Sequence, residues 1–305
     1  MNESGRLTRV PFGQREADGQ LIDVHDAARG AHCSCRCPSC RMPLIARQGD
    51  EKVWHFAHRT QGDEAIAEQA CAYSFFVSVR LMARQLLAAG QTLALPAAVG
   101  QVSFEVPELG IRRERPYPIT AGAVVVLNDV EIDPRRQGVT VDLSGRVRDA
   151  ELLVVFSHPE RAVADAVHAL NGDRVGVLAV DLRPLAADFA TARTRQLSYR
   201  DLLSRFLAQE TASRHWLFHP REARMRARAM AELEAEIAAE RWAQARPVDC
   251  HCLFCGTRWR EPAGVVHACR RCQTHLGTRV NAVGAGGTGG APPPLALRWR
   301  HLRSL

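Results

Sequence analysis

Both ends of the sequence carry pairs of metal-binding residue types with two other residues between the members of each pair. The first set is Cys37, Cys40, His55 and His58, and the second set is Cys252, Cys255, Cys269 and Cys272. Each pair can hold one side of a tetrahedral zinc ion, and two pairs complete its coordination. We therefore expect two structural Zn²⁺ sites. Because a closed shell leaves no position for a substrate, neither is expected to be catalytic.

Other potential ligands lie near these two sets. Cys71 is expected to pack as a small hydrophobic residue at the start of a helix. Cys33 and Cys35 precede the first set and are expected to be spectators or ligands of a second, weak ion. Cys250 and His267 lie beside the second set, and we leave them out because four thiolates already satisfy zinc.

The cysteines and the opening residues also bear on the cellular compartment. Nine of the 10 cysteines fall in or beside the paired motifs, which favours metal-bound thiolates over a disulfide framework. The opening residues form no apolar segment of the signal-peptide kind, and no apolar run has the length of a membrane helix. We expect a protein of the reducing cytoplasm that does not insert into a membrane.

The charge balance is basic. The formal net charge is +7, and arginine supplies nearly all of the positive charge because Lys52 is the one lysine. A GC-rich genome would explain arginine in place of lysine, but it would not explain the excess of positive charge. Arginine binds phosphate oxygens in a bidentate manner, so the expected partner is a nucleic acid, with DNA favoured. The arginines expected to contact phosphates are Arg112, Arg113, Arg135, Arg136, Arg221, Arg224 and Arg228.

Hydrophobic periodicity predicts a central α/β region. Apolar residues spaced by three and four predict a helix over residues 65–89, and residues 152–156 read as a strand covered on both faces. A turn at Ser144-Gly145 is expected before that strand. A helix over 159–170 and a second apolar strand over 175–182 then complete a parallel crossover.

The rest of the chain is expected to be modular. Further helices are predicted over residues 199–209 and 220–246, and the charge order of the second one opposes the helix dipole, so a partner would compensate its basic end. The expected segments are a polar segment (1–30), a Cys₂His₂ zinc module (31–62), an α/β domain (63–190), a helical segment (191–247), a zinc ribbon (248–280) and a flexible Gly/Pro linker with a basic tail (281–305).

The first metal motif and the residues around it resemble a known family. The sequence Cys37-Pro-x-Cys40-x-x-Pro-Leu-Ile-Ala-Arg-x-Gly, followed by Lys52-x-Trp-His55-Phe-Ala-His58, is similar to the amino-terminal module of competence protein CoiA and its relatives. The similarity continues to about residue 185, although fewer residues match the family there. It implies a core domain of the PD-(D/E)XK nuclease superfamily, which we expect as a mixed sheet flanked by the two zinc modules.

The resemblance also implies where a nuclease centre would lie. Such enzymes place an Asp at the head of one strand and Glu-x-Lys or Glu-x-Gln on the next, so that the acids hold Mg²⁺ and the Lys or Gln positions water. One alignment of this pattern with the chain, which we call the first register, places the Asp position on Gly138 and the Glu position on Leu153. This register predicts a degenerate centre.

A second alignment of the nuclease pattern, which we call the shifted register, has an acid at both positions. Asp142 and Glu151 could then lie on neighbouring strands as catalytic ligands of Mg²⁺, with Glu131 or Asp133 as a third acid. No Lys or Gln follows Glu151 at the required spacing, and acids on neighbouring strands are often ion-paired with local arginines. Whether the chain is an enzyme stays open, and if it is one, it is a metal-dependent nuclease.

We therefore expect a DNA-binding or DNA-processing protein of CoiA-like type with a degenerate nuclease centre. One alternative is an active Mg²⁺-dependent DNase that uses Asp142 and Glu151. A second alternative is a zinc-stapled scaffold that binds a protein partner or a second copy of itself. Salt-dependent DNA affinity would favour the first function, and a stable oligomer indifferent to DNA would favour the scaffold.

Overall fold

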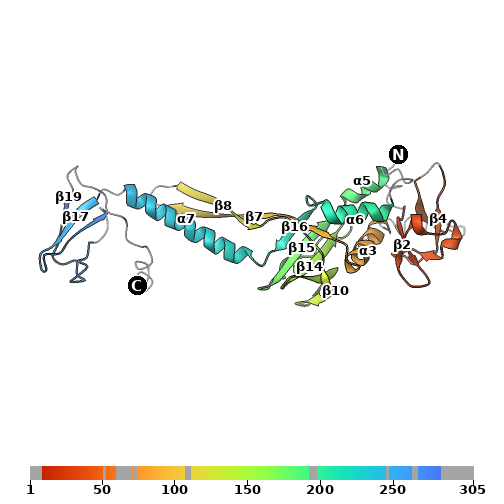
Figure 1. Ribbon diagram of the computed structural model, residues 1–305, viewed down its shortest axis with the longest axis horizontal. Helices are drawn as coiled ribbons and strands as arrows, with labels where there is room; N and C mark the ends of the chain where they lie inside the picture. The colour runs from red at the N-terminus through yellow and green to blue at the C-terminus, as the bar shows by residue number, and fades with distance from the viewer. Residues whose placement is uncertain are drawn as a thin grey trace. The chain divides into compact units, whose positions relative to one another are not determined.

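The computed structural model describes residues 9–50, 53–59, 71, 74–106, 111–191, 198–244, 247–262 and 267–282. The chain divides into two compact units, one formed by Met1–Gly100 with Pro118–Ala223 and the other by Gln101–Tyr117 with Arg224–Leu305 (Figure 1). The fold is mixed α/β, as predicted. None of the described helices combines the length and the apolar character needed to cross a membrane.

The first unit begins with small antiparallel sheets. They contain the strands β1 (Phe12–Arg15), β2 (Leu21–Asp23), β3 (Cys35–Arg36), β4 (Leu44–Arg47) and β5 (His55–His58), with short 3₁₀ turns at Val24–Asp26 and Ala31–Cys33. β1 pairs with β2 and β3, and β4 pairs with β5. Residues 9–30 are thus structured, which differs from the weakly patterned segment expected there, and Val10, Phe12 and Val24 are fully buried.

A five-stranded mixed sheet forms the centre of the first unit. Its strands are β10 (Asn128–Ile132), β13 (Leu143–Val147), β14 (Ala150–Ser157), β15 (Val175–Asp181) and β16 (Arg214–Phe218), in the order β10-β13-β14-β15-β16. β14 and β15 are parallel, and the other neighbours are antiparallel. The apolar strands over 152–156 and 175–182 are therefore adjacent parallel strands, and buried residues cover both faces of this pair.

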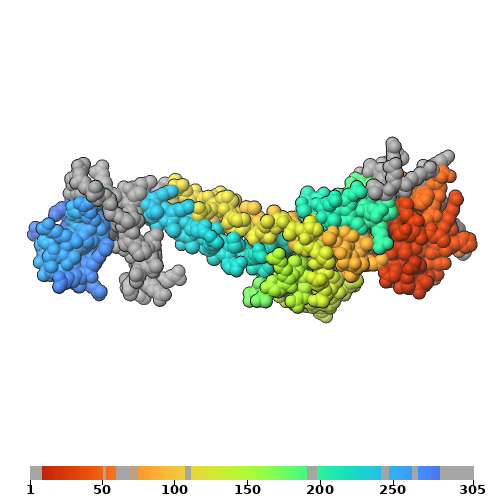
Figure 2. All heavy atoms as spheres, viewed as in Figure 1, coloured from red at the N-terminus to blue at the C-terminus, as the bar shows by residue number. Residues whose placement is uncertain are grey.

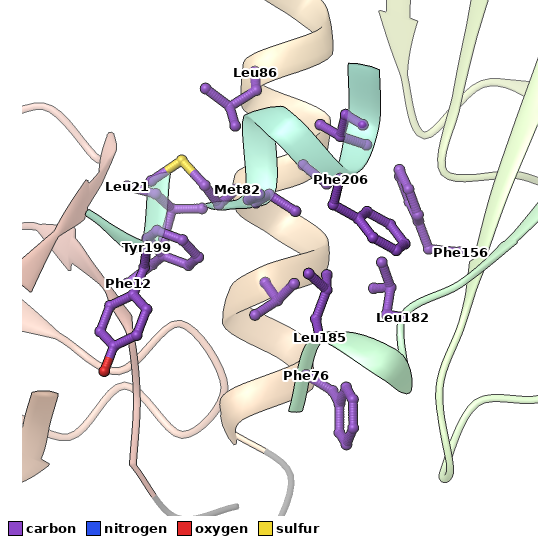
Figure 3. Packing of buried hydrophobic residues seen from close by; sticks show 14 of the residues in the cluster. Phe12, Leu21, Phe76, Met82, Leu86, Phe156, Leu182, Leu185, Tyr199 and Phe206 are labelled. Atoms are coloured by element: carbon purple, nitrogen blue, oxygen red, sulfur yellow. The ribbon is translucent and has the colours of Figure 1, made fainter. Parts of the chain in front are cut away.

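Helices cover one face of this sheet. They are α3 (Ser74–Ala88), α5 (Pro184–Thr191) and α6 (Tyr199–Gln209). Figure 3 shows Phe76, Met82 and Leu86 of α3 between the amino-terminal residue Phe12 and the sheet residue Phe156. The segments predicted as 1–30, 31–62 and 63–190 thus share one hydrophobic core.

Hydrogen bonds join the amino-terminal strands to the helices. The Gln85 side chain exchanges two hydrogen bonds with the backbone of Leu21, at 2.9 and 3.0 Å. The backbone N–H of Arg200 donates to the fully buried carboxylate of Asp23 (2.7 Å). The Tyr199 hydroxyl donates to the Trp54 carbonyl (2.8 Å). These buried polar contacts fix the small sheets on α3 and α6.

Three predicted boundaries change in the structure. Ser144-Gly145 lies inside β13, and the hairpin turn falls at Arg148, whose φ of 57° is left-handed. The helix predicted over 159–170 is one turn, α4 (Asp165–His168). α3 begins at Ser74, and of the earlier predicted helical residues the structure describes only Cys71, which lies in a turn. The hydrophobic pattern of the sequence did not predict the strands β1, β2 and β16 or the helix α5.

The second unit combines a long hairpin with a long helix. β7 (Ala98–Val106) and β8 (Ile111–Thr120) form the hairpin, and α7 (Glu222–Gln244) buries Ala229, Leu233 and Ile237 at intervals of four residues. Arg113 of β8 pairs with Glu240 of α7 (2.7 Å), and Arg115 pairs with Glu236 (2.5 Å). Figure 2 shows the hairpin in yellow against α7 in cyan. Arginines of the chain itself therefore compensate the acidic half of α7.

The ribbon is a three-stranded antiparallel sheet in the order β18-β17-β19. Its strands are β17 (Pro247–Cys252), β18 (Arg258–Pro262) and β19 (Thr278–Ala282). β19 extends the predicted ribbon by two residues, and the predicted linker and tail beyond residue 282 lie outside the described residues. Four short strands complete the fold in two pairs, β6 (Leu93–Leu95) with β9 (Ala123–Val125) and β11 (Arg135–Arg136) with β12 (Val139–Thr140).

Candidate metal centres and a buried carboxylate

The first cysteine cluster contains one ligand that the sequence pattern did not assign. The atoms of Cys37, Cys40, His58 and Cys71 that could bind a metal all lie within 4.8 Å of one another. The Sγ atoms of Cys37 and Cys71 are 3.5 Å apart, and Cys40 Sγ lies 3.3 Å from His58 Nε2. This is a three-thiol, one-imidazole set, and the expected ligand His55 is not part of it.

The alternation of side chains along β5 explains the exchange of His55 for Cys71. Successive side chains of a strand point to opposite faces, so His55 and His58, three positions apart, cannot face the same ion. The His55 ring nitrogen Nδ1 lies 2.8 Å from the Val53 carbonyl oxygen. Cys71, expected to pack as a small hydrophobic residue, fills the fourth position and is buried. The strand period could have excluded His55, but no local spacing connects Cys71 to the first pair.

A shared turn shapes all three Cys-x-x-Cys pairs. In the pair that begins at Cys37, the Cys37 N–H donates to the Met42 carbonyl (2.8 Å), and the Arg41 N–H donates to the Cys37 carbonyl (2.9 Å). The turns that begin at Cys252 and Cys269 repeat both hydrogen bonds. The fifth residue of each turn is left-handed: Arg41, Gly256 and Gln273 have φ of 65°, 69° and 54°. The turn brings both sulfur atoms of a pair to one side of the backbone.

The second cluster contains the four cysteines expected from the sequence. Ligand atoms of Cys252, Cys255, Cys269 and Cys272 also lie within 4.8 Å of one another. Cys255 Sγ is 3.4 Å from Cys269 Sγ, and Cys252 Sγ is 4.0 Å from Cys272 Sγ. A tetrahedral zinc–thiolate site has edges of about 3.8 Å, whereas a disulfide needs about 2 Å. Both clusters therefore contain free thiols at separations that suit a metal ion.

Local hydrogen bonds favour the thiolate form at one position in each cluster. In the first cluster, a hydrogen bond from the Cys37 thiol lowers the pKa of Cys71 to about 3, and the same contact raises the pKa of Cys37. In the second, the Thr257 hydroxyl, 3.1 Å from Cys255 Sγ, lowers the pKa of Cys255 to about 6. Because a thiolate is the form that binds a metal, each cluster already favours one anionic ligand.

Asp142 lies at the head of β13 and is fully buried. Its Oδ1 accepts a hydrogen bond from Arg80 Nε of α3 (2.5 Å), and its Oδ2 accepts from Arg161 Nη1 and from the Phe156 backbone N–H, both at 2.8 Å. The carboxylate is therefore bound by two guanidinium groups and one amide. Arg80 comes from α3, which precedes the sheet in the chain.

His158 lies beside this centre at the end of β14. Its ring stacks on Phe76 of α3, with 5.4 Å between centroids and 3° between planes. Burial lowers the pKa of His158, and the neighbouring Arg161 and Arg80 lower it further. A neutral, stacked imidazole next to two arginines is a packing residue of the sheet–helix interface.

The structure does not bring Asp142 and Glu151 together. In the β13–β14 register, Leu143 lies opposite Val154 and Arg146 lies opposite Glu151, so the two acids are at opposite ends of the strand pair. Glu151 is part-exposed and pairs with Arg136 (2.9 Å), which also pairs with Glu131 (2.8 Å). Among the described residues, neither acid belongs to a group of three or more potential metal ligands. The shifted register required Asp142 and Glu151 to lie together as ligands of one Mg²⁺ ion, and the structure corrects this expectation.

The first register also changes in the structure. Gly138 lies in the turn between β11 and β12, with φ of 83°, and Leu153 pairs with Ser144. The acid next to the strand head is Asp142, four positions after Gly138.

The arginines expected to contact DNA differ in what they already bind. Four of them have an acidic partner: Arg112 pairs with Glu114, Arg113 with Glu240, Arg136 with Glu131 and Glu151, and Arg228 with Glu232. Within the described part of the chain, no acidic partner is recorded for Arg135, Arg221 or Arg224, although Arg135 donates to the Gly138 carbonyl. The latter three are the arginines whose charge is available to a ligand.

Comparison with known protein families identifies the first of these regions. Residues 23–64 match the family described as competence protein CoiA, N-terminal domain. We refer to this matched segment as the CoiA-type domain, after the family that it resembles. The CoiA-type domain contains Cys37, Cys40 and His58, while Cys71 lies beyond the matched residues. It begins eight residues before the expected start of the zinc module at residue 31, and the family match does not extend into the central sheet. No curated protein and no solved structure matches the chain.

Proposed function

We propose that the chain binds DNA and that its nuclease-like centre does not cleave it. The observation that carries this proposal is the buried carboxylate of Asp142, which two arginines of the same chain hold at 2.5 and 2.8 Å. The CoiA-type domain at residues 23–64 supports a role linked to competence, in which DNA is the molecule handled.

Asp142 satisfies half of the nuclease pattern. It stands at the head of β13, next to β14, where the PD-(D/E)XK arrangement has its first acid. β14 should then carry Glu-x-Lys opposite this acid, but its residues there are apolar, from Leu152 to Phe156. A lone carboxylate without a second acid or a water-positioning lysine does not form a Mg²⁺ site.

Arg80 and Arg161 take the position of the missing cation. A buried carboxylate needs a counter-charge, and a nuclease supplies it as a metal ion. Here two guanidinium groups neutralise Asp142, and they would repel an incoming Mg²⁺. This arrangement argues against the alternative in which Asp142 and Glu151 form an active Mg²⁺-dependent DNase.

Two zinc ions would complete the metal centres. Both clusters offer the soft sulfur and imidazole donors that zinc prefers, at the separations of a tetrahedral shell. With four protein ligands each, the zinc ions would be structural. Ten free thiols in the chain suit a reducing compartment, so we propose the cytoplasm as its location.

The arginines without acidic partners would contact the phosphates. Arg221 directly precedes α7, and Arg224 lies in the first turn of this helix. The net charge of +7 adds long-range attraction to a polyanion. Arg113 is already paired with Glu240 and should contribute less.

DNA binding at two salt concentrations tests this proposal. Fluorescence anisotropy with labelled single- and double-stranded DNA should show affinity that falls steeply between 50 and 200 mM salt. The double variant Arg221→Ala/Arg224→Ala should weaken binding, and Arg113→Ala serves as the matched control. An affinity that does not change with salt, or is equal in the wild type and the double variant, would contradict the proposed surface.

A protein-interaction scaffold is the second candidate, and one observation favours it. Leu253, Phe254 and Leu276 are 52%, 68% and 70% exposed at one end of the ribbon. Exposed apolar side chains that gather in one place often mark a binding surface. Size-exclusion chromatography with light scattering would favour this candidate if the chain forms an oligomer that DNA does not alter.

A further inference from the structure

A third group of potential metal ligands lies in the ribbon beside the four cysteines. It consists of Cys250 on β17, Glu261 on β18 and His267, which precedes Cys269. Their thiol, carboxylate and imidazole ligand atoms lie within 4.8 Å of one another. Cys250 is 1% exposed, Glu261 5%, and the side chain of His267 9%.

The register of the ribbon sheet directs two of these side chains to one face. Cys250 lies opposite Trp259, and Val248 lies opposite Glu261. Because residues two apart on a strand share a face, Cys250 and Glu261 lie on the same side of the sheet. Cys252, a ligand of the four-cysteine cluster, shares this side with Cys250. His267 lies next to this side, with Nδ1 3.1 Å from Glu261 Oε2.

The electrostatics of this group also suit a cation. A buried carboxylate beside a buried thiol is an unfavourable pair unless positive charge is present. The described positive groups close to Glu261 are His267, with Nδ1 3.1 Å from Oε2, and Arg270, 3.7 Å from Oε1.

We propose that Cys250, Glu261 and His267 bind a third zinc ion. One sulfur, one nitrogen and one oxygen donor form a set that zinc accepts, whereas Mg²⁺ and Ca²⁺ prefer oxygen donors alone. Binding would release the thiol proton of Cys250, and a water molecule would complete the tetrahedron. Arg270 would remain a partner of the Glu261 oxygen that does not bind the metal. This site is separate from the two structural zinc sites, and it does not depend on DNA binding.

The competing explanation is an ion pair without a metal. In that case, Glu261, His267 and Arg270 would only fasten the second cysteine pair to the sheet, and Cys250 would pack as a small apolar residue. The two explanations predict different metal contents, so the number of zinc ions per chain separates them.

Mass spectrometry of the metal content of the full chain tests the proposal. The wild type should contain three zinc ions per chain, and Cys250→Ala and Glu261→Gln should each contain two. Cys33→Ala, which removes a buried cysteine outside every cluster, is the matched control and should keep three. Two ions in the wild type, or three in Cys250→Ala, would overturn the proposal.

Cobalt substitution shows whether a lost ion reflects a lost site or a lost fold. The four-cysteine site gives strong thiolate-to-cobalt absorption, which should persist in Cys250→Ala and Glu261→Gln. Loss of that absorption in both variants would also overturn the proposal, because the group would then be part of the four-cysteine site and not a site of its own.

Discussion

The two cysteine clusters and the Asp142 centre solve the same problem in opposite ways. Each places potential anions inside the protein. Each of the two clusters surrounds a position with sulfur or imidazole donor atoms. The Asp142 centre supplies two arginines, Arg80 and Arg161, from the chain itself. The clusters therefore need an external cation, and Asp142 does not.

This difference indicates which metals the chain can use. A group of thiols lowers its free energy by binding zinc and losing protons. A carboxylate already bound by two guanidinium groups gains little from Mg²⁺, because the ion would first have to displace them and shed its own water. We expect changes at the zinc clusters to have the largest effects, changes at the two acids to have smaller ones, and single arginine replacements to have the smallest.

Removal of zinc should have its largest effect on the ribbon. The buried apolar residues recorded there are Val248 and the cysteines themselves, so the sheet has almost no core of its own. Structural zinc contributes about 10–16 kcal/mol in small modules. With a strong chelator, we expect rapid proteolysis within residues 247–282, read by mass spectrometry.

The chelated chain provides its own control for this prediction. The CoiA-type domain shares a large core with α3 and α6 through Val24 and Phe56, so it should resist the same protease. Equal protection of the ribbon with and without chelator would contradict the account of the clusters.

Replacement of one ligand should separate the two possible shells of the first cluster. Cys71→Ala should lower the zinc content by one ion per chain, because only three ligands remain. His55→Ala should keep the full zinc content, since His55 does not belong to the cluster. Metal analysis of both variants decides the matter, and the reverse pattern would restore the Cys₂His₂ shell expected from the sequence.

The two acids of the sheet should differ in their effect on stability. Asp142→Ala leaves Arg80 and Arg161 unpaired, and breaking a buried ion pair costs about 3–5 kcal/mol. Glu151→Ala removes a part-exposed pair with Arg136, which is worth about 0–1 kcal/mol. Denaturant unfolding measures both free energies. Equal losses in the two variants would mean that Asp142 is not held as described.

Single arginine replacements should have the smallest effect. Arg224→Ala should reduce the slope of log affinity against log salt by about 0.9 if it contacts one phosphate of duplex DNA. Arg112→Ala should leave the slope nearly unchanged, because Arg112 is paired with Glu114 (3.1 Å). A change in slope for Arg112 alone would move the proposed surface from α7 to the hairpin.

The sequence predicted the features that local patterns determine. The Cys-x-x-Cys turns depend on a few neighbouring residues, and all three formed as expected. The apolar strands over 152–156 and 175–182 also carried enough information to predict their parallel pairing. The helix over 199–209 has its predicted bounds, and Ser198 caps its first turn.

Features that depend on distant contacts could not be predicted in this way. Cys71 reaches the first cluster only through tertiary folding, and Arg80 meets Asp142 across 62 positions of the chain. Gly138, the Asp position of the first register, lies in the β11–β12 turn, whereas the acid at the head of β13 is Asp142. The spacing along the chain did not reveal this difference.

A cleavage assay tests whether the chain binds DNA without cleaving it at the Asp142 centre. Labelled single- and double-stranded DNA would be incubated with the full chain in Mg²⁺, in Mn²⁺ and in EDTA, with binding followed in parallel. The account predicts salt-sensitive binding and no cleavage that depends on either metal. Metal-dependent cleavage that is lost in Asp142→Asn would contradict it, because Asp142 would then hold a catalytic ion in spite of Arg80 and Arg161.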